Sequence, residues 1–197
     1  LIPLSYMWQL GSILNTKKKQ KFNIPIIIIG NVVAGGAGKT PTVISLANKL
    51  INSNIKVHII LKGYKSAAKK SIQVNTKLHT YKDVGDEAII CSKIAPTWVG
   101  KSRIASINNA TNNGADLVIL DDGLQDSSIE SDLNILVFSG LQGIGNGRII
   151  PSGPMREHLS KAVDKSDLAI IIEEDKNNIK KLISKDIPVL NAKLKIE

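Results

Sequence analysis

The sequence predicts an α/β protein in which two layers of helices enclose a mostly parallel sheet. Short runs of aliphatic residues, such as residues 26–29, alternate along the chain with helix-like patterns. Strands that are covered on both faces are apolar along their whole length, and such strands are typical of parallel sheets. Aromatic residues make up only 4% of the chain, so Ile, Leu and Val supply most of the expected core. This alternation favours an open sheet with ligands at the carboxyl ends of its strands.

The expected elements follow one another in a regular order. The first strand, residues 24–29, ends just before Gly30. The helix after it is expected to begin at Pro41, because proline is tolerated at the first position of a helix. Val43, Ala47 and Leu50 then recur at helical spacing. Later strands are expected at residues 56–61, 117–120, 133–138, 168–172 and 189–196, and later helices at residues 86–95 and 101–113.

Charge and composition narrow the class of partner. The chain has 197 residues and a formal net charge of +9, which favours an anionic partner such as a phosphorylated ligand or a lipid surface. No nucleic-acid partner is expected, because aromatic residues do not alternate with the basic ones and no zinc-finger spacing is present. The one cysteine, Cys91, falls on the apolar side of an expected helix and is interpreted as a small core residue.

The N-terminal segment is apolar and then strongly basic. Residues 1–14 include Tyr6 and Trp8, and lysines follow at positions 17, 18, 19 and 21. The apolar part is shorter than the roughly 20 residues that a helix needs to cross a bilayer. It is expected either to dock on an anionic membrane surface or to pack on the core as an ordinary helix. We expect this segment and its basic loop at residues 1–23, the core at residues 24–175, and the start of an incomplete C-terminal subdomain at residues 176–197.

The glycine-rich stretch after the first strand is similar to the phosphate loop of a P-loop NTPase-like fold. Its second half consists of Gly35, Gly36, Ala37, Gly38, Lys39 and Thr40. Glycines let backbone N–H groups point at phosphate oxygens, while Lys39 would contact the β- and γ-phosphates of ATP and Thr40 would bind Mg²⁺. Val33 replaces the first glycine of the usual motif. A Rossmann dinucleotide site is disfavoured, because residues 49–56 contain no Asp or Glu where that site requires an acid.

Two adjacent carboxylates follow a later strand. Residues 117–120 lead into Asp121 and Asp122, as in the Walker B element that holds the metal ion of P-loop proteins. Neighbouring carboxylates at a strand end are costly unless a cation or a donor compensates them. An Asp-Asp pair before a glycine is also typical of a turn, but the phosphate loop nearby in the expected fold favours Mg²⁺ binding by both.

Two more clusters have residue types suited to chemistry. Asp86 and Glu87 begin an expected helix, where carboxylates stabilise the helix N-terminus, and Asp86 is equally suited to accept the proton of an attacking hydroxyl. Residues 143–157 contain too much glycine and proline for regular structure and form either a functional loop or an exposed linker. Arg148 and Arg156 in this stretch are candidates for neutralising phosphates.

These motifs occur together and in one order: Gly30-Asn31, Gly35-Gly36, Gly38-Lys39-Thr40-Pro41, Gly63-Tyr64, Gly85-Asp86-Glu87, Asp121-Asp122-Gly123-Leu124-Gln125, Gly145-Asn146-Gly147, Pro151, Gly153-Pro154 and Arg156-Glu157. Their combination, over residues 24–172, resembles the tetraacyldisaccharide 4'-kinase family of lipid A synthesis. The resemblance implies a kinase that uses ATP and Mg²⁺ to phosphorylate the 4'-hydroxyl of an acylated glucosamine disaccharide 1-phosphate, forming lipid IVA. It also implies peripheral binding to the anionic cytoplasmic face of the bacterial inner membrane.

The resemblance also implies roles for individual residues. The catalytic residues are Asp86 and Lys39, residues 35–40 bind ATP, and the metal ligands are Thr40, Asp121 and Asp122. Substrate contacts are expected from Arg103 and Gln125, and from Asn146 and Arg148 of the later loop.

The sequence departs from the family pattern at several positions. Ala37 stands where the family has Ser or Thr, Lys62 where it has Arg, Ala88 where it has Pro, and Asp126 where it has His. The family's histidine that supports the catalytic aspartate lies beyond Glu197, so we expect this chain by itself to bind nucleotide poorly or to turn over slowly. Two alternatives remain: a P-loop switch that hydrolyses nucleotide to change partners, and a nucleotide-binding relic without catalysis.

Overall fold

The computed structural model describes residues 19–63, 70–183 and 186–195. Its strands are β1 (Ile26–Gly30), β2 (Val57–Lys62), β3 (Ile72–Gln73), β4 (Thr97–Gly100), β5 (Leu117–Asp121), β6 (Leu133–Ser139), β7 (Leu168–Ile172) and β8 (Val189–Ala192). Its helices are α2 (Lys39–Asn52), α3 (Tyr81–Val84), α4 (Asp86–Ser92), α5 (Arg103–Asn112), α6 (Leu159–Asp164) and α7 (Ile179–Ile183).

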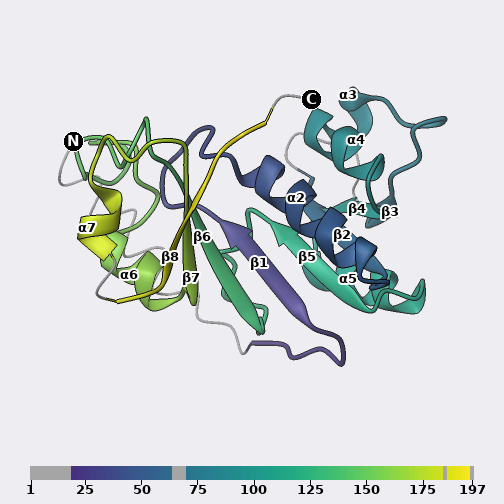
Figure 1. Ribbon diagram of the computed structural model, residues 1–197. Coiled ribbons are helices and arrows are strands. Elements are labelled where there is room, and N and C mark those ends of the chain that lie inside the picture. Colours follow the sequence, from purple (N-terminus) through teal and green to yellow (C-terminus); the bar gives the residue numbers. More distant parts are fainter. Residues whose placement is uncertain (1–18, 64–69, 184–185, 196–197) are drawn as a thin grey trace.

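One sheet organises the described part of the chain. Its eight strands lie in the order β3-β4-β2-β5-β1-β6-β7-β8 (Figure 1). Every neighbouring pair is parallel except β3 and β4, which are antiparallel. The predicted α/β fold with a mostly parallel sheet is therefore confirmed.

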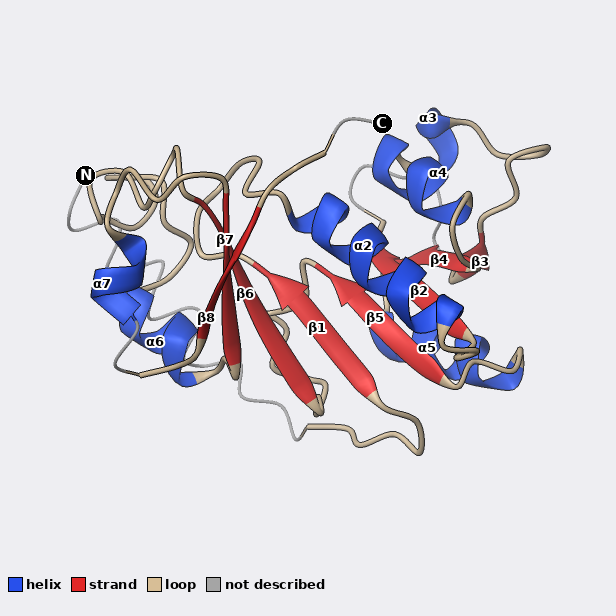
Figure 2. Ribbon diagram, in the orientation of Figure 1, coloured by secondary structure: helices blue, strands red, loops and turns tan. Residues whose placement is uncertain are grey.

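Helices cover both faces of the sheet and complete three layers (Figure 2). On one face, α2 and α4 bury Val43, Ala47, Ala88 and Cys91 against alternate residues of the central strands. On the other face, the buried side chains come from α5, α6 and α7 and include Ile107, Val163 and Ile179. The interpretation of Cys91 as a core residue is confirmed, since its side chain is fully buried.

Most differences from the predicted elements occur where the apolar pattern is short. Helix α2 begins at Lys39 rather than Pro41, directly after Gly38, whose φ of 85° is not helical. Pro41 fits inside the first turn because the first backbone N–H groups of a helix have no partner within the helix. Strand β4 was not predicted, since its four residues include Thr97 and Trp98 instead of an aliphatic run. The short elements β3, α3, α6 and α7 were not predicted either.

The strand order brings the functional motifs to one edge. Strand β1 lies between β5 and β6, and the register places Ile29 opposite Asp121. The carboxyl ends of β1 and β5 are therefore adjacent, although many residues separate them in the chain. Ligands of open α/β sheets bind at this edge.

The predicted division of the chain stays a prediction. Residues 1–18 of the N-terminal segment lie outside the described residues, and Lys21 of its basic loop lies 3.7 Å from the Glu130 carboxylate. Strand β8 continues the same sheet beyond residue 175, because it pairs with β7. None of the described helices is both long enough and apolar enough to cross a membrane.

Candidate active site

The phosphate loop connects β1 to α2 and borders a hollow of about 410 Å³. Residues 35–41 line this hollow, and Glu87 of α4 lines it beside Thr40. Gly38 has to be glycine here, because its φ is 85° and a Cβ atom would lie 2.4 Å from Ile172 Cδ1. The backbone of Val33 forms a β-bridge with Met155, so this residue belongs to the packed part of the loop and needs no glycine.

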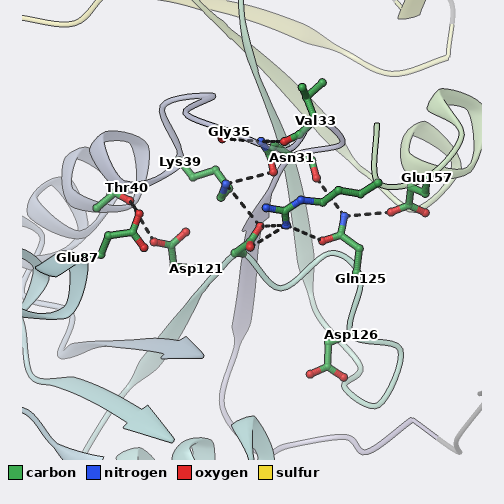
Figure 3. Close-up of polar contacts among 12 residues, drawn as sticks. Asn31, Val33, Gly35, Lys39, Thr40, Glu87, Asp121, Gln125, Asp126 and Glu157 are labelled. Atoms are coloured by element: carbon green, nitrogen blue, oxygen red, sulfur yellow. Dashed lines mark hydrogen bonds and ion pairs between the residues drawn. The ribbon is translucent and has the colours of Figure 1, made fainter. Parts of the chain in front are cut away.

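Lys39 is held at the mouth of the loop by polar partners. Its Nζ donates a hydrogen bond to Asn31 Oδ1 at 3.1 Å and lies 3.6 Å from Asp122 Oδ1 (Figure 3). Asn31 in turn donates from Nδ2 to the backbone oxygen of Val33 at 2.5 Å. Asn31 belongs to the Gly30-Asn31 motif, but its part in the site follows only from the fold: it is 1% exposed and supports both Lys39 and the loop.

Thr40, Asp121 and Glu87 form an oxygen-rich group beside Lys39. The Thr40 Oγ1 atom lies 3.4 Å from Asp121 Oδ2 and 3.2 Å from Glu87 Oε1. The second oxygen of Asp121 is buried without a hydrogen-bond partner. Burial, followed by the charge of Glu87, raises the pKa of Asp121 to about 7. Excess negative charge and an orphaned oxygen fit a hard cation that prefers oxygen ligands.

These residues fit a magnesium ion that is shared with a nucleotide. Mg²⁺ in P-loop proteins needs a hydroxyl and about one carboxylate, since phosphates and waters supply its other ligands. Accordingly, no cluster of three or more His, Cys, Asp or Glu side chains able to hold a metal by themselves occurs in the described ranges. Glu87 was not predicted as a ligand, because its approach to Thr40 depends on how α4 packs.

Asp122 points away from this oxygen group. Arg156 Nη1 donates to both of its carboxylate oxygens, each at 2.8 Å. Burial opposes ionisation of Asp122, but the hydrogen bond from Arg156 and the positive charges of Lys39, Arg156 and Arg103 outweigh it and lower the pKa. The structure thus separates the two predicted metal ligands: Asp121 lies by Thr40, whereas Asp122 lies between two cations. Metal binding by Asp122 stays a prediction.

Arg103 lies beneath the acidic turn and is almost completely buried. Its Nη2 donates to the backbone oxygens of Asp121 and Asp122, at 3.3 and 2.6 Å, and its Nη1 contacts Asp126 Oδ2 at 3.1 Å. The negative charge of Asp126 balances the positive charge of Arg103. With its guanidinium engaged in this way, Arg103 positions the acidic turn. Its contact with substrate stays a prediction.

The remaining predicted substrate residues fall in two places. Gln125 is close to the phosphate loop, since its Nε2 donates to the backbone oxygen of Asn31 at 3.0 Å. Asn146 and Arg148 are exposed, and Asn146 hydrogen-bonds within its own loop, to the oxygen of Ser152 and the N–H of Arg148. From that glycine-rich stretch, Arg156 contacts Asp122 and Glu157 accepts a hydrogen bond from Gln125.

Asp86 is exposed at the first position of α4. Its Oδ1 accepts a hydrogen bond from the backbone N–H of Glu87 at 3.0 Å. Asp86 does not line the hollow itself but directly precedes Glu87, which does. The role of Asp86 stays a prediction.

Replacing Asp121 with asparagine is expected to stabilise the protein at pH 8 without Mg²⁺. Between the ordinary Asp pKa of 3.8 and about 7, the folded state holds a proton that the unfolded state releases. Stability therefore falls as the pH rises through this window, whereas asparagine carries no charge to bury. We expect a gain in unfolding free energy of about 1 to 3 kcal/mol at pH 8 and a smaller gain at pH 5. Urea denaturation at both pH values measures it.

Asp122→Asn is the matched control for this prediction, because the neighbouring carboxylate has a lowered pKa and contacts Arg156. This variant should lose stability at pH 8, opposite in sign to Asp121→Asn. Equal effects of Asp121→Asn at pH 5 and pH 8 would contradict the burial of a negative charge at this position.

Comparisons with known proteins agree with this geometry. The sequence profile of the family described as tetraacyldisaccharide-1-P 4'-kinase matches residues 1–197. A tetraacyldisaccharide 4'-kinase of Jannaschia sp. is 40% identical over 177 residues, which cover 89% of this chain and 54% of that protein. The enzyme of the same name from Paramagnetospirillum magneticum is 38% identical over 197 residues, 98% of this chain and 61% of that protein. The chain thus spans little more than half the length of these curated relatives.

Solved structures show the same fold. LpxK from Aquifex aeolicus, solved in complex with ATP, superposes with a TM-score of 0.80 at 25% identity, covering 97% of this chain and 63% of that one. The hydrogenase maturation factor HypB from Archaeoglobus fulgidus has a TM-score of 0.54 at 13% identity, covering 96% of this chain and 86% of that one. The second likeness shows the fold alone.

Proposed function

Because the chain belongs to the tetraacyldisaccharide-1-P 4'-kinase family, we propose that it transfers the γ-phosphate of ATP to the 4'-hydroxyl of a tetraacyldisaccharide 1-phosphate. The product would be lipid IVA in lipid A synthesis. The observation that carries the proposal is the hollow that Lys39, Thr40 and Glu87 line, with Asp121 in contact with Thr40 beside it. This arrangement suits a triphosphate and its magnesium ion.

Binding of ATP would use the loop backbone and Lys39. The N–H groups of the glycine turn and the start of α2 favour phosphate oxygens. Lys39 already lies between Asn31 and Asp122, so its ammonium group is positioned before nucleotide arrives. Thr40, Asp121 and Glu87 would hold Mg²⁺, which neutralises charge on the phosphates when it is bound.

Transfer needs a base for the sugar hydroxyl and a positive charge near the moving phosphoryl group. Asp86, which directly precedes Glu87, would accept the proton from the 4'-hydroxyl. Arg156 and Lys39 both flank Asp122, so they supply positive charge next to the place of the γ-phosphate. Asn31 and Arg103 would keep the loop and the acidic turn in position.

The lipid acceptor is the reason for the membrane location that we propose. An acylated disaccharide stays in a bilayer, so the protein would work as a peripheral protein on the cytoplasmic face of the bacterial inner membrane. Its formal net charge of +9 supports attraction to an anionic surface.

A transfer assay tests this function. The protein is incubated with Mg²⁺ and ATP labelled in the γ-phosphate, with and without tetraacyldisaccharide 1-phosphate, and labelled lipid and free phosphate are counted separately. We expect labelled lipid only when the acceptor is present. Phosphate release that is equal without acceptor would favour the P-loop switch. If neither labelled lipid nor free phosphate forms, and Lys39→Ala leaves nucleotide binding unchanged, the result would favour the nucleotide-binding relic without catalysis.

A further inference from the structure

The loop between β3 and α3 projects from the end of the molecule that carries α3 and α4 (Figure 1). The loop carries Leu78, and the first residue of α3 is Tyr81; their exposed fractions of 76% and 64% are the highest among the large apolar side chains in the described ranges. Single exposed apolar residues are ordinary on protein surfaces. Two such residues three positions apart, in the segment 77–82 that we call the tip, indicate a contact with something outside the described chain.

The local fold holds these side chains outward. The Asn75 backbone oxygen accepts hydrogen bonds from the N–H groups of Leu78 and His79, at 3.0 and 2.8 Å. Thr80 begins α3 with a capping box, in which its N–H and hydroxyl both donate to Asp83 Oδ2 at 2.8 Å. Since turn and cap are both hydrogen-bonded, Leu78 and Tyr81 remain at the tip instead of folding back onto the core.

The charges around the tip favour an anionic lipid surface. Exposed Lys77 and Lys82 flank the two apolar residues, and the acidic neighbour Asp83 accepts hydrogen bonds from the Thr80 N–H and hydroxyl. With two lysines against one aspartate, residues 77–83 keep an excess of positive charge. Leucine and tyrosine partition into the headgroup region of a bilayer, and neighbouring lysines gain electrostatic energy from anionic lipids. An acidic protein surface would use the lysines but would leave the leucine without a matching partner.

The tip is connected to the candidate active site through very little chain. Helix α3 ends at Val84, and Gly85 leads directly into Asp86 at the start of α4. Helices α3 and α4 also pack on each other. Because Tyr81 and Asp86 are five residues apart, a surface that binds the tip lies within about 18 Å of Asp86.

We infer that Leu78 and Tyr81 insert into the headgroup region of an anionic bilayer while Lys77 and Lys82 contact its phosphates. The docked tip places Asp86 next to the surface from which an acylated acceptor is drawn. In this respect the inference rests on the proposed function, because a lipid acceptor gives docking at this edge its purpose.

A site-specific fluorescent probe tests the insertion. Leu78→Cys and Tyr81→Cys are each labelled with a polarity-sensitive nitrobenzoxadiazole at the introduced thiol. Cys91 should remain unlabelled, because it is fully buried and burial raises the pKa of its thiol to about 12. With vesicles that contain phosphatidylglycerol, the emission of both probes should shift to shorter wavelength and rise at least about twofold. Vesicles of phosphatidylcholine alone should produce little change.

Leu182→Cys is the matched control. Leu182 is 52% exposed on α7 and follows two lysines, but α7 lies at the opposite end of the molecule (Figure 1). Its probe should not respond. The inference would be overturned if the Leu182 probe responded equally, or if the tip probes did not respond in vesicle-bound protein. It would also be overturned if the protein did not bind vesicles, or if the emission of the tip probes were already blue-shifted before vesicles were added. An equal shift with polyglutamate would assign the tip to an acidic protein instead. No ATP or acceptor is present, so the result is independent of the transfer assay.

Discussion

Asp86→Asn is expected to slow phosphoryl transfer to the lipid acceptor by about 100-fold to 10,000-fold, the range that a general base contributes. Asparagine keeps an oxygen that can accept the hydrogen bond from the Glu87 N–H, so the start of α4 is retained. It cannot accept a proton from the 4'-hydroxyl at neutral pH. The rate of labelled phosphate transfer at saturating ATP and acceptor measures the effect.

Binding of ATP should distinguish a lost base from a disturbed site. Asp86 does not line the hollow around the phosphate loop, so the affinity of Asp86→Asn for ATP should equal that of the unaltered protein. Asp164→Asn, which alters an exposed carboxylate on α6, should leave the rate unchanged. If Asp86→Asn transfers phosphate within a few-fold of the normal rate, another group is the base.

Lys39→Ala is expected to lower kcat/KM for ATP by roughly 100-fold to 1,000-fold. Losses of this size follow in other enzymes when one fixed hydrogen-bond donor to the charged transition state is removed. Lys39 is the cation that the phosphate loop presents at the hollow, and its side chain is only 13% exposed. Calorimetry with Mg²⁺ and ATP should show weaker binding as well, because the ground-state phosphates lose a charged donor.

The fold should survive this substitution. Without Lys39, Asp122 keeps its two hydrogen bonds to Arg156. Asp121 loses the positive charge of Lys39, which acts to lower its pKa, and therefore holds a proton more readily. Lys49→Ala, in the last turn of the same helix, removes an equal charge from an exposed position and should leave binding unchanged. Normal ATP binding and transfer by Lys39→Ala would contradict the role of the loop and with it the proposed kinase.

Asp126, one of the expected departures from the family pattern, is bound inside the fold. It accepts hydrogen bonds from Ser128 and from Arg103. Burial opposes its ionisation, but the Ser128 hydrogen bonds and Arg103 outweigh burial and lower its pKa. Asp126 and Arg103 therefore form an internal ion pair beneath the acidic turn.

The sequence by itself determined the class of fold, the phosphate loop and the acidic strand end. Each of these rests on neighbours in the chain: the buried run of β1, the glycines before Lys39, and Asp121 directly after the apolar part of β5. Local patterns of this kind can be recognised because hydrophobic periodicity and glycine conformation act over only a few residues.

Only the tertiary structure decided which side chains meet. Glu87 reaches Thr40 because α4 packs beside α2. Asp122 points away from Asp121 and toward Arg156, and Arg103 is buried beneath the backbone carbonyls of the two aspartates. These contacts join residues that are far apart in the chain, and they follow from the place of β5 beside β1 in the sheet. Strand order depends on the packing free energy of the whole core, so a single sequence shows which residues can do chemistry but not how they face one another.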